Sequence, residues 1–254
     1  MNILLILIIG LLCSVFVNYL SDVLPTQRKI AAPVCPSCNA PFKLLNYISF
    51  TPCRICHTRR SLRSYLVLLA SLMIAVCLWI WPPTIGFSIS ILILTYFGIV
   101  AVIDVEHRLI MHVVSLAGGI IFAAIGTILH GWQTTLFGGL AGGGVMLIFY
   151  WIGTIFAKYR AKKLGQDDDE EALGFGDVTI SAVLGLLVGW PDIMLTLLIG
   201  VIIGGFFSLL MILILSLMRR YNAMTVFTAY GPFLLVGASM MIFFRENVLA
   251  LFFG

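Results

Sequence analysis

The chain has 254 residues, of which 61% are hydrophobic and only 10% are charged, and its formal net charge is +4 at pH 7. A soluble domain carries about 25% charged residues, so this composition excludes an ordinary soluble globular protein. It predicts a polytopic membrane protein that buries apolar surface against lipid. Membrane lipid is therefore an expected partner, and nucleic acid is not.

The apolar runs of the sequence predict about eight transmembrane helices. The first run, Ile3–Leu20, is long enough to span a membrane, and its start lacks the positive charges of a cleaved signal peptide. A polar segment, Ser21–Ser64, separates it from seven further runs. These are Tyr65–Trp81, Gly86–Ile103, Leu109–Leu129, Thr134–Ala157, Val178–Trp190, Ile193–Met218 and Val226–Phe244.

The positive charges gather in the loops that eight spans would place on one side. These loops are Ser21–Ser64, Asp104–Arg108, Lys158–Glu171 and Arg219–Asn222, and they hold all but one of the 15 lysines and arginines. Positive loops face the cytoplasm. We therefore expect a cell-membrane protein with both termini outside and with these four loops inside.

Four cysteines in the first polar segment form two C-x-x-C pairs, Cys35 with Cys38 and Cys53 with Cys56. Paired thiolates on two turns are typical ligands of a tetrahedral zinc ion, and a closed set of four indicates a structural site. The alternative is four reduced thiols without a metal. The sequence thus predicts an all-α membrane protein with a small cytoplasmic zinc-ribbon-like insertion. We divide it into a first helix (1–20), a zinc-binding loop with the four cysteines (21–64) and a seven-helix core (65–254).

Two aspartates lie at the cytoplasmic ends of predicted helices. Asp104 follows the run Gly86–Ile103, and Asp177 precedes the run Val178–Trp190. An ionisable group at membrane depth costs about 2.5–3.5 kcal/mol, so it usually has a function or a partner. If the two carboxylates meet, they share one proton and supply an acid and a base at neutral pH. The alternative is that each merely caps its helix or faces water.

Glycines flank the second aspartate. Gly174 and Gly176 carry no side chain, so an extended substrate backbone could approach Asp177 closely. We expect these two glycines to form the substrate approach. Asp22 and Asp192 show no role in the sequence.

The sequence resembles the type IV prepilin peptidases, a family of membrane aspartic proteases. Gly174-Phe175-Gly176-Asp177 matches the G-x-G-D motif of that family. The other similar segments are Asn18–Pro25, the two C-x-x-C pairs, Ser61–Tyr65, Asp104 with Leu109-Ile110, and Tyr230–Phe233. The resemblance thus runs in order over nearly the whole chain.

The resemblance implies that Asp104 and Asp177 are catalytic and that the cysteine loop binds zinc. It also implies cleavage of the short basic leader of pilin-like precursors at the cytoplasmic face. Many members then methylate the new N-terminus with S-adenosylmethionine. The chain departs from the family pattern at Met111 and His112, where Ile-Pro is common after the first aspartate, and at Thr179, where lysine is common.

Two alternatives belong to other functional classes. A transporter or proton relay would also carry intramembrane carboxylates, although usually nearer the middle of a helix. An inactive assembly factor of the same fold would bind the precursor without cutting it, and the three departures are its only support.

Overall fold

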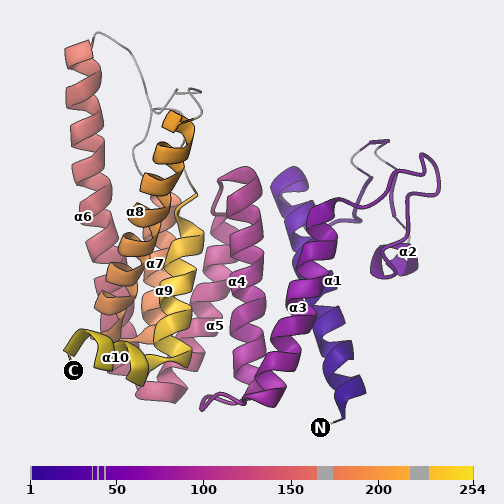
Figure 1. Ribbon diagram of the computed structural model, residues 1–254, viewed down its shortest axis with the longest axis horizontal. Helices are drawn as coiled ribbons and strands as arrows, with labels where there is room; N and C mark the ends of the chain where they lie inside the picture. Colours follow the sequence, from indigo (N-terminus) through magenta and orange to yellow (C-terminus); the bar gives the residue numbers. More distant parts are fainter. Residues whose placement is uncertain are drawn as a thin grey trace. The chain divides into compact units, whose positions relative to one another are not determined.

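The computed structural model describes residues 2–35, 37–38, 40–42, 44–164, 174–217 and 229–253 (Figure 1). The regular elements in these ranges are all α-helices, beside one isolated bridge between Val34 and Pro41. The loop predicted at Arg219–Asn222 and residues 165–171 of the loop predicted at Lys158–Glu171 lie outside the described residues, whereas residues 158–164 of the latter are helical and not a loop. The chain packs as two compact units, residues 1–107 and 108–254.

The first unit contains α1 (Ile3–Gln27), α2 (Leu44–Ile48), α3 (Leu62–Ile80) and α4 (Phe87–His107). Helix α1 packs against both α3 and α4. Small residues allow the close approach: a Cβ atom on Gly10 would lie 3.2 Å from Ala75 Cβ and from Leu72 Cα. Such contacts drive helix association in lipid, where burial of apolar surface gives no advantage between helices.

The second unit contains α5 (His112–His130), α6 (Trp132–Leu164), α7 (Phe175–Val188), α8 (Asp192–Leu217), α9 (Gly231–Phe243) and α10 (Arg245–Phe253). Helix α7 contacts α5, α6, α8 and α9 and is therefore central to this unit. Its closest partner is α6, against which glycines of both helices pack. A Cβ atom on Gly185 would lie only 2.7 Å from the carbonyl carbon of Gly138.

The all-helical membrane class predicted from the sequence is confirmed. Six helices of the described residues are long and apolar enough to cross a membrane, and a seventh span is possible if α9 and α10, bent by 101°, count as one. Helix α7 has 14 residues, about 21 Å, which is shorter than a hydrocarbon core of about 30 Å. It ends at Gly189, whose φ of 80° favours glycine and closes the helix.

The two compact units are defined by contacts between their helices, and these contacts do not show where a membrane lies. The division at residues 20 and 64 therefore stays a prediction, as does the outside location of both termini.

Candidate functional site

Asp104 lies in the last turn of α4 and is 5% exposed. Apolar residues of the same helix, among them Val100 and Ile103, are buried beside it. The helix ends at His107, and the next residue, Arg108, adopts a φ of 50°. A left-handed residue at this position is a common way to end a helix. The chain thus turns away directly after a buried carboxyl group.

Asp177 is the third residue of α7 and is 8% exposed. Its backbone N–H donates to the carbonyl oxygen of Gly174, which caps the helix. A carboxylate in the first turn is stabilised by the positive end of the helix dipole. Tyr230, the residue before α9, interacts electrostatically with this carboxylate. The second aspartate is therefore a buried group with an aromatic hydroxyl in its electrostatic field.

Gly176 packs against the segment that follows the first aspartate. A Cβ atom on Gly176 would lie 2.7 Å from Ile110 Cβ, so only glycine fits against this side chain. Among the described residues, a Cβ atom on Gly174 would have only the backbone nitrogen of Gly176 near it, at 4.0 Å. The structure thus gives Gly176 a packing role, and the substrate-approach role of both glycines stays a prediction.

Thr179 takes the place at which lysine is common in the family. Its hydroxyl donates to the carbonyl oxygen of Gly176 at 2.8 Å and lies 3.5 Å from the Ser115 hydroxyl of α5. These contacts hold the first turn of α7 by neutral hydrogen bonds.

The register of α6 against α7 shows how deep Asp177 lies in the second unit. Gly138 packs on Gly185 and Gly142 on Ser181, so Asp177 is level with about residue 146 of α6. The apolar span of α6 runs from Trp132 to Phe156. At 1.5 Å per residue, Asp177 therefore lies about 15 Å from the Phe156 end of that span.

Helix α9 also begins part-way along a longer neighbour. Tyr230 packs on Gly204 of α8, and Gly237 packs on Thr196. Figure 1 shows the long helices α6 and α8 continuing past the first residues of α7 and α9. Asp177 and Tyr230 thus stand at the starts of two short helices.

Asp104 belongs to the first unit and Asp177 to the second. The structure shows each of them buried at a helix end, as the sequence predicted. Their catalytic roles and their meeting stay predictions.

The four cysteines come together in the first unit. Their sulfur atoms all lie within 4.8 Å of one another. Cys35 Sγ is 3.5 Å from Cys56 Sγ, and Cys38 Sγ is 3.7 Å from Cys53 Sγ. Zinc–sulfur bonds of about 2.3 Å in a tetrahedron place neighbouring sulfurs about 3.8 Å apart. The set therefore fits a structural zinc ion, which these four residues would hold.

Hydrogen bonds favour the thiolate form of Cys56. The hydroxyl and backbone N–H of Thr58 lower the pKa of Cys56 to about 6. Cys35 and Cys53 are buried, and their N–H groups donate to the carbonyl oxygens of Ala40 and Thr58. Two tight turns thus direct the four sulfurs toward one point.

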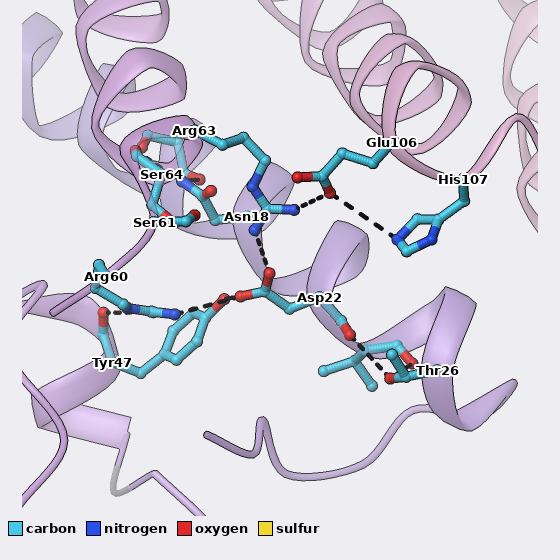
Figure 2. A network of polar contacts seen from close by, with 12 residues as sticks. Asn18, Asp22, Thr26, Tyr47, Arg60, Ser61, Arg63, Ser64, Glu106 and His107 are labelled. Carbon is cyan, nitrogen blue, oxygen red and sulfur yellow. Dashed lines mark hydrogen bonds and ion pairs between the residues drawn. The ribbon is translucent and has the colours of Figure 1, made fainter. Parts of the chain in front are cut away.

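An ionic cluster around Asp22 is the part of the first unit that sequence reasoning missed. Asp22 accepts hydrogen bonds from Tyr47, Arg60 and Arg63, and Arg63 also binds Glu106 (Figure 2). One signal was available in the sequence. Asp22 is the only acidic residue of the segment Ser21–Ser64, which holds seven lysines and arginines.

Comparison with known proteins supports the family resemblance. A model of the type IV leader peptidase family matches residues 91–209, a little under half of the chain. No curated protein and no solved structure gives a match. The matched segment contains Asp104 and Asp177, and it is similar to the type IV leader peptidase family.

Proposed function

We propose that the protein is a membrane aspartic endopeptidase that removes the basic leader of type IV prepilin-like precursors at the cytoplasmic membrane face. Asp104 and Asp177 are its catalytic dyad. One observation carries the proposal: the segment that matches a leader peptidase family contains two aspartates, each buried at the end of an apolar helix.

The proposed chemistry needs one proton shared between two carboxyl groups. The ionised carboxylate takes a proton from water, and the water oxygen attacks the scissile carbonyl carbon. The protonated partner gives its proton to the carbonyl oxygen. The carboxyl group that took the water proton then gives it to the leaving amine, and the collapsing gem-diol returns a hydroxyl proton to the other carboxylate, so that the dyad is again singly protonated. The pair titrates as a unit, so neither aspartate is assigned the role of base.

A short covalent link supports the meeting of the two aspartates. Ile110 follows Asp104 by six positions in the sequence, and it packs against Gly176, which precedes Asp177. The residue that packs on Gly176 is therefore close in sequence to the first aspartate.

The depth of Asp177 bears on the substrate. A precursor consists of a basic leader followed by an apolar helix. If the α6 span crosses the membrane, Asp177 lies about 15 Å from its Phe156 end. The junction between leader and helix must enter to that depth, where water is scarce and electrostatic interactions are strong.

The cysteine loop and the methylation are further parts of the proposal. Zinc held by the four cysteines supplies folding free energy to the loop and takes no part in cleavage. The resemblance extends the proposal to N-methylation of the product with S-adenosylmethionine.

A cleavage assay tests the proposal. The purified protein in detergent is incubated with a pilin-like precursor, and the products are identified by mass spectrometry. We expect one cut, at the junction of leader and apolar helix. A product heavier by one methyl group, formed only with S-adenosylmethionine, would establish the second activity.

Other outcomes of this assay favour the alternatives. Binding of precursor without a cut would favour an inactive assembly factor. Proton flux in liposomes without a cut would favour a transporter.

A further inference from the structure

Four parts of the first unit meet at the ionic cluster around Asp22 (Figure 2). Asp22 lies on α1, Tyr47 on α2, Arg63 on α3 and Glu106 on α4. Arg60, which lies just before α3, is the fifth member. Its guanidinium lies 3.8 Å from the centre of the Tyr47 ring and 3.3 Å from an Asp22 oxygen.

Arg63 binds two carboxylates from two different helices. One terminal nitrogen donates to Asp22 Oδ1, and the other donates to Glu106 Oε2 at 2.6 Å. The Arg63 side chain is 18% exposed, so these bonds form in a partly dry environment. The planar fork of arginine suits two acceptors at fixed positions, whereas the single ammonium of lysine does not.

Glu106 lies at an unfavourable end of its helix. It belongs to the last turn of α4, where the helix dipole disfavours a negative charge. The bond to Arg63 offsets this cost and ties the end of α4 to α1 and α3. Helix ends fray when nothing holds them. Asp104 lies in the same last turn, two residues before Glu106.

We propose that Arg63 is a positioning residue for Asp104, acting through Glu106 and braced by Asp22. The proposal rests on the proposed peptidase function for its kinetic consequence. The cysteine loop takes part through Tyr47 and Arg60, whose bonds to Asp22 hold the carboxylate against Arg63.

Removal of Arg63 leaves the remaining groups with partners. Asp22 keeps its bonds to Tyr47 and Arg60, and the Glu106 side chain is 35% exposed and can bind water. We therefore expect Arg63→Met to fold. Arg59→Met is the matched control, because Arg59 is an exposed arginine of the same basic segment.

The test compares Arg63→Met, Glu106→Gln, the double variant and Arg63→Lys in steady-state cleavage. A misplacement of about 1 Å costs up to about 100-fold in rate, so we expect Arg63→Met to lower kcat roughly 10- to 100-fold with KM within about twofold. The double variant should lose no more than Arg63→Met alone, because both changes break one contact. Arg63→Lys should recover part of kcat, and Arg59→Met should behave as wild type.

Hydrogen exchange tests the proposal independently of activity. The amides of residues 104–107 should exchange faster in Arg63→Met and Glu106→Gln than in wild type or Arg59→Met. Should wild type cleave no precursor, this readout still decides the positioning role. Unchanged exchange, or multiplying losses of kcat in the double variant, would overturn it. If Arg63→Met does not fold, Glu106→Gln decides: wild-type kcat and exchange in that variant overturn the proposal.

Discussion

Replacing Gly185 by alanine should separate α6 from α7. The added methyl carbon would overlap the carbonyl oxygen of Gly138. It would lie 2.7 Å from the carbonyl carbon of Gly138 and 3.0 Å from Gly139 Cα. These are backbone atoms, which cannot rotate away. Carbon atoms in contact lie about 3.5–4.0 Å apart, so the helices must separate locally by roughly 1 Å. Overpacking of this kind costs about 1–3 kcal/mol.

The matched control for this variant is Gly144→Ala on α6. A Cβ atom there meets no atom of the described residues within 4 Å. Both substitutions exchange glycine for alanine within a helix and gain a similar propensity, up to about 1 kcal/mol. The difference in unfolding free energy between the two variants therefore isolates the clash, and we expect it to be about 1–3 kcal/mol.

The assay is reversible unfolding in detergent, followed by leader cleavage at a temperature at which both variants are folded. Because α7 carries Asp177, a shift of roughly 1 Å should also lower kcat by up to about 100-fold. Equal stability of Gly185→Ala and Gly144→Ala would refute the register of α6 against α7, and with it the depth assigned to Asp177.

Three further predictions follow from the site. Gly176→Ala should lower cleavage because the new Cβ meets Ile110 Cβ at 2.7 Å, and adding Ile110→Ala should restore part of the activity; no restoration would contradict the packing role of Gly176. Burial and the Asp22 carboxylate raise the pKa of Tyr47 above its ordinary value near 10. The folded state therefore holds the Tyr47 hydroxyl proton more tightly than the unfolded state does. The stabilisation that results is complete below about pH 10 and is lost as pH rises through the folded pKa. The free energy of unfolding should therefore fall more steeply above pH 10 in wild type than in Tyr47→Phe. Chelation of the metal should destabilise the loop around Cys35 and Cys53, and hydrogen exchange of residues 33–60 should become faster. The control Cys77→Ser, which lies outside the cluster, should leave the metal content unchanged. A metal-free preparation in which this loop is still protected from exchange would contradict the zinc site.

Much of the fold could be predicted because long apolar runs in a sequence identify membrane helices. The apolar run Val178–Trp190 gave nearly the length of α7, but the helix begins at Phe175, before the apolar run, so that Asp177 lies within its first turn. The cysteine cluster was predictable because its ligand spacing is local. Its sulfur distances agree with that expectation.

The ionic cluster was not predictable, because it depends on tertiary contacts. Asp22 and Arg63 are 41 residues apart, and Arg63 and Glu106 are 43 apart. A lone acid among seven cations hinted that Asp22 has a partner, but the sequence does not say which cation it binds. In the same way, Ile110 is an ordinary apolar residue until the structure places it on Gly176.

The most direct test of the peptidase function is the single-turnover rate of leader cleavage in wild type, Asp104→Asn and Asp177→Asn. Asparagine keeps the shape of the side chain and removes its acid–base chemistry. Asp192→Asn is the matched control, because Asp192 is bound by Arg245 at the opposite end of α8 from Leu217 and lies outside the proposed dyad. We predict that each dyad variant loses at least about 100-fold in rate while folding normally, and that the control cleaves as wild type does. Wild-type cleavage by either dyad variant would contradict the aspartate mechanism.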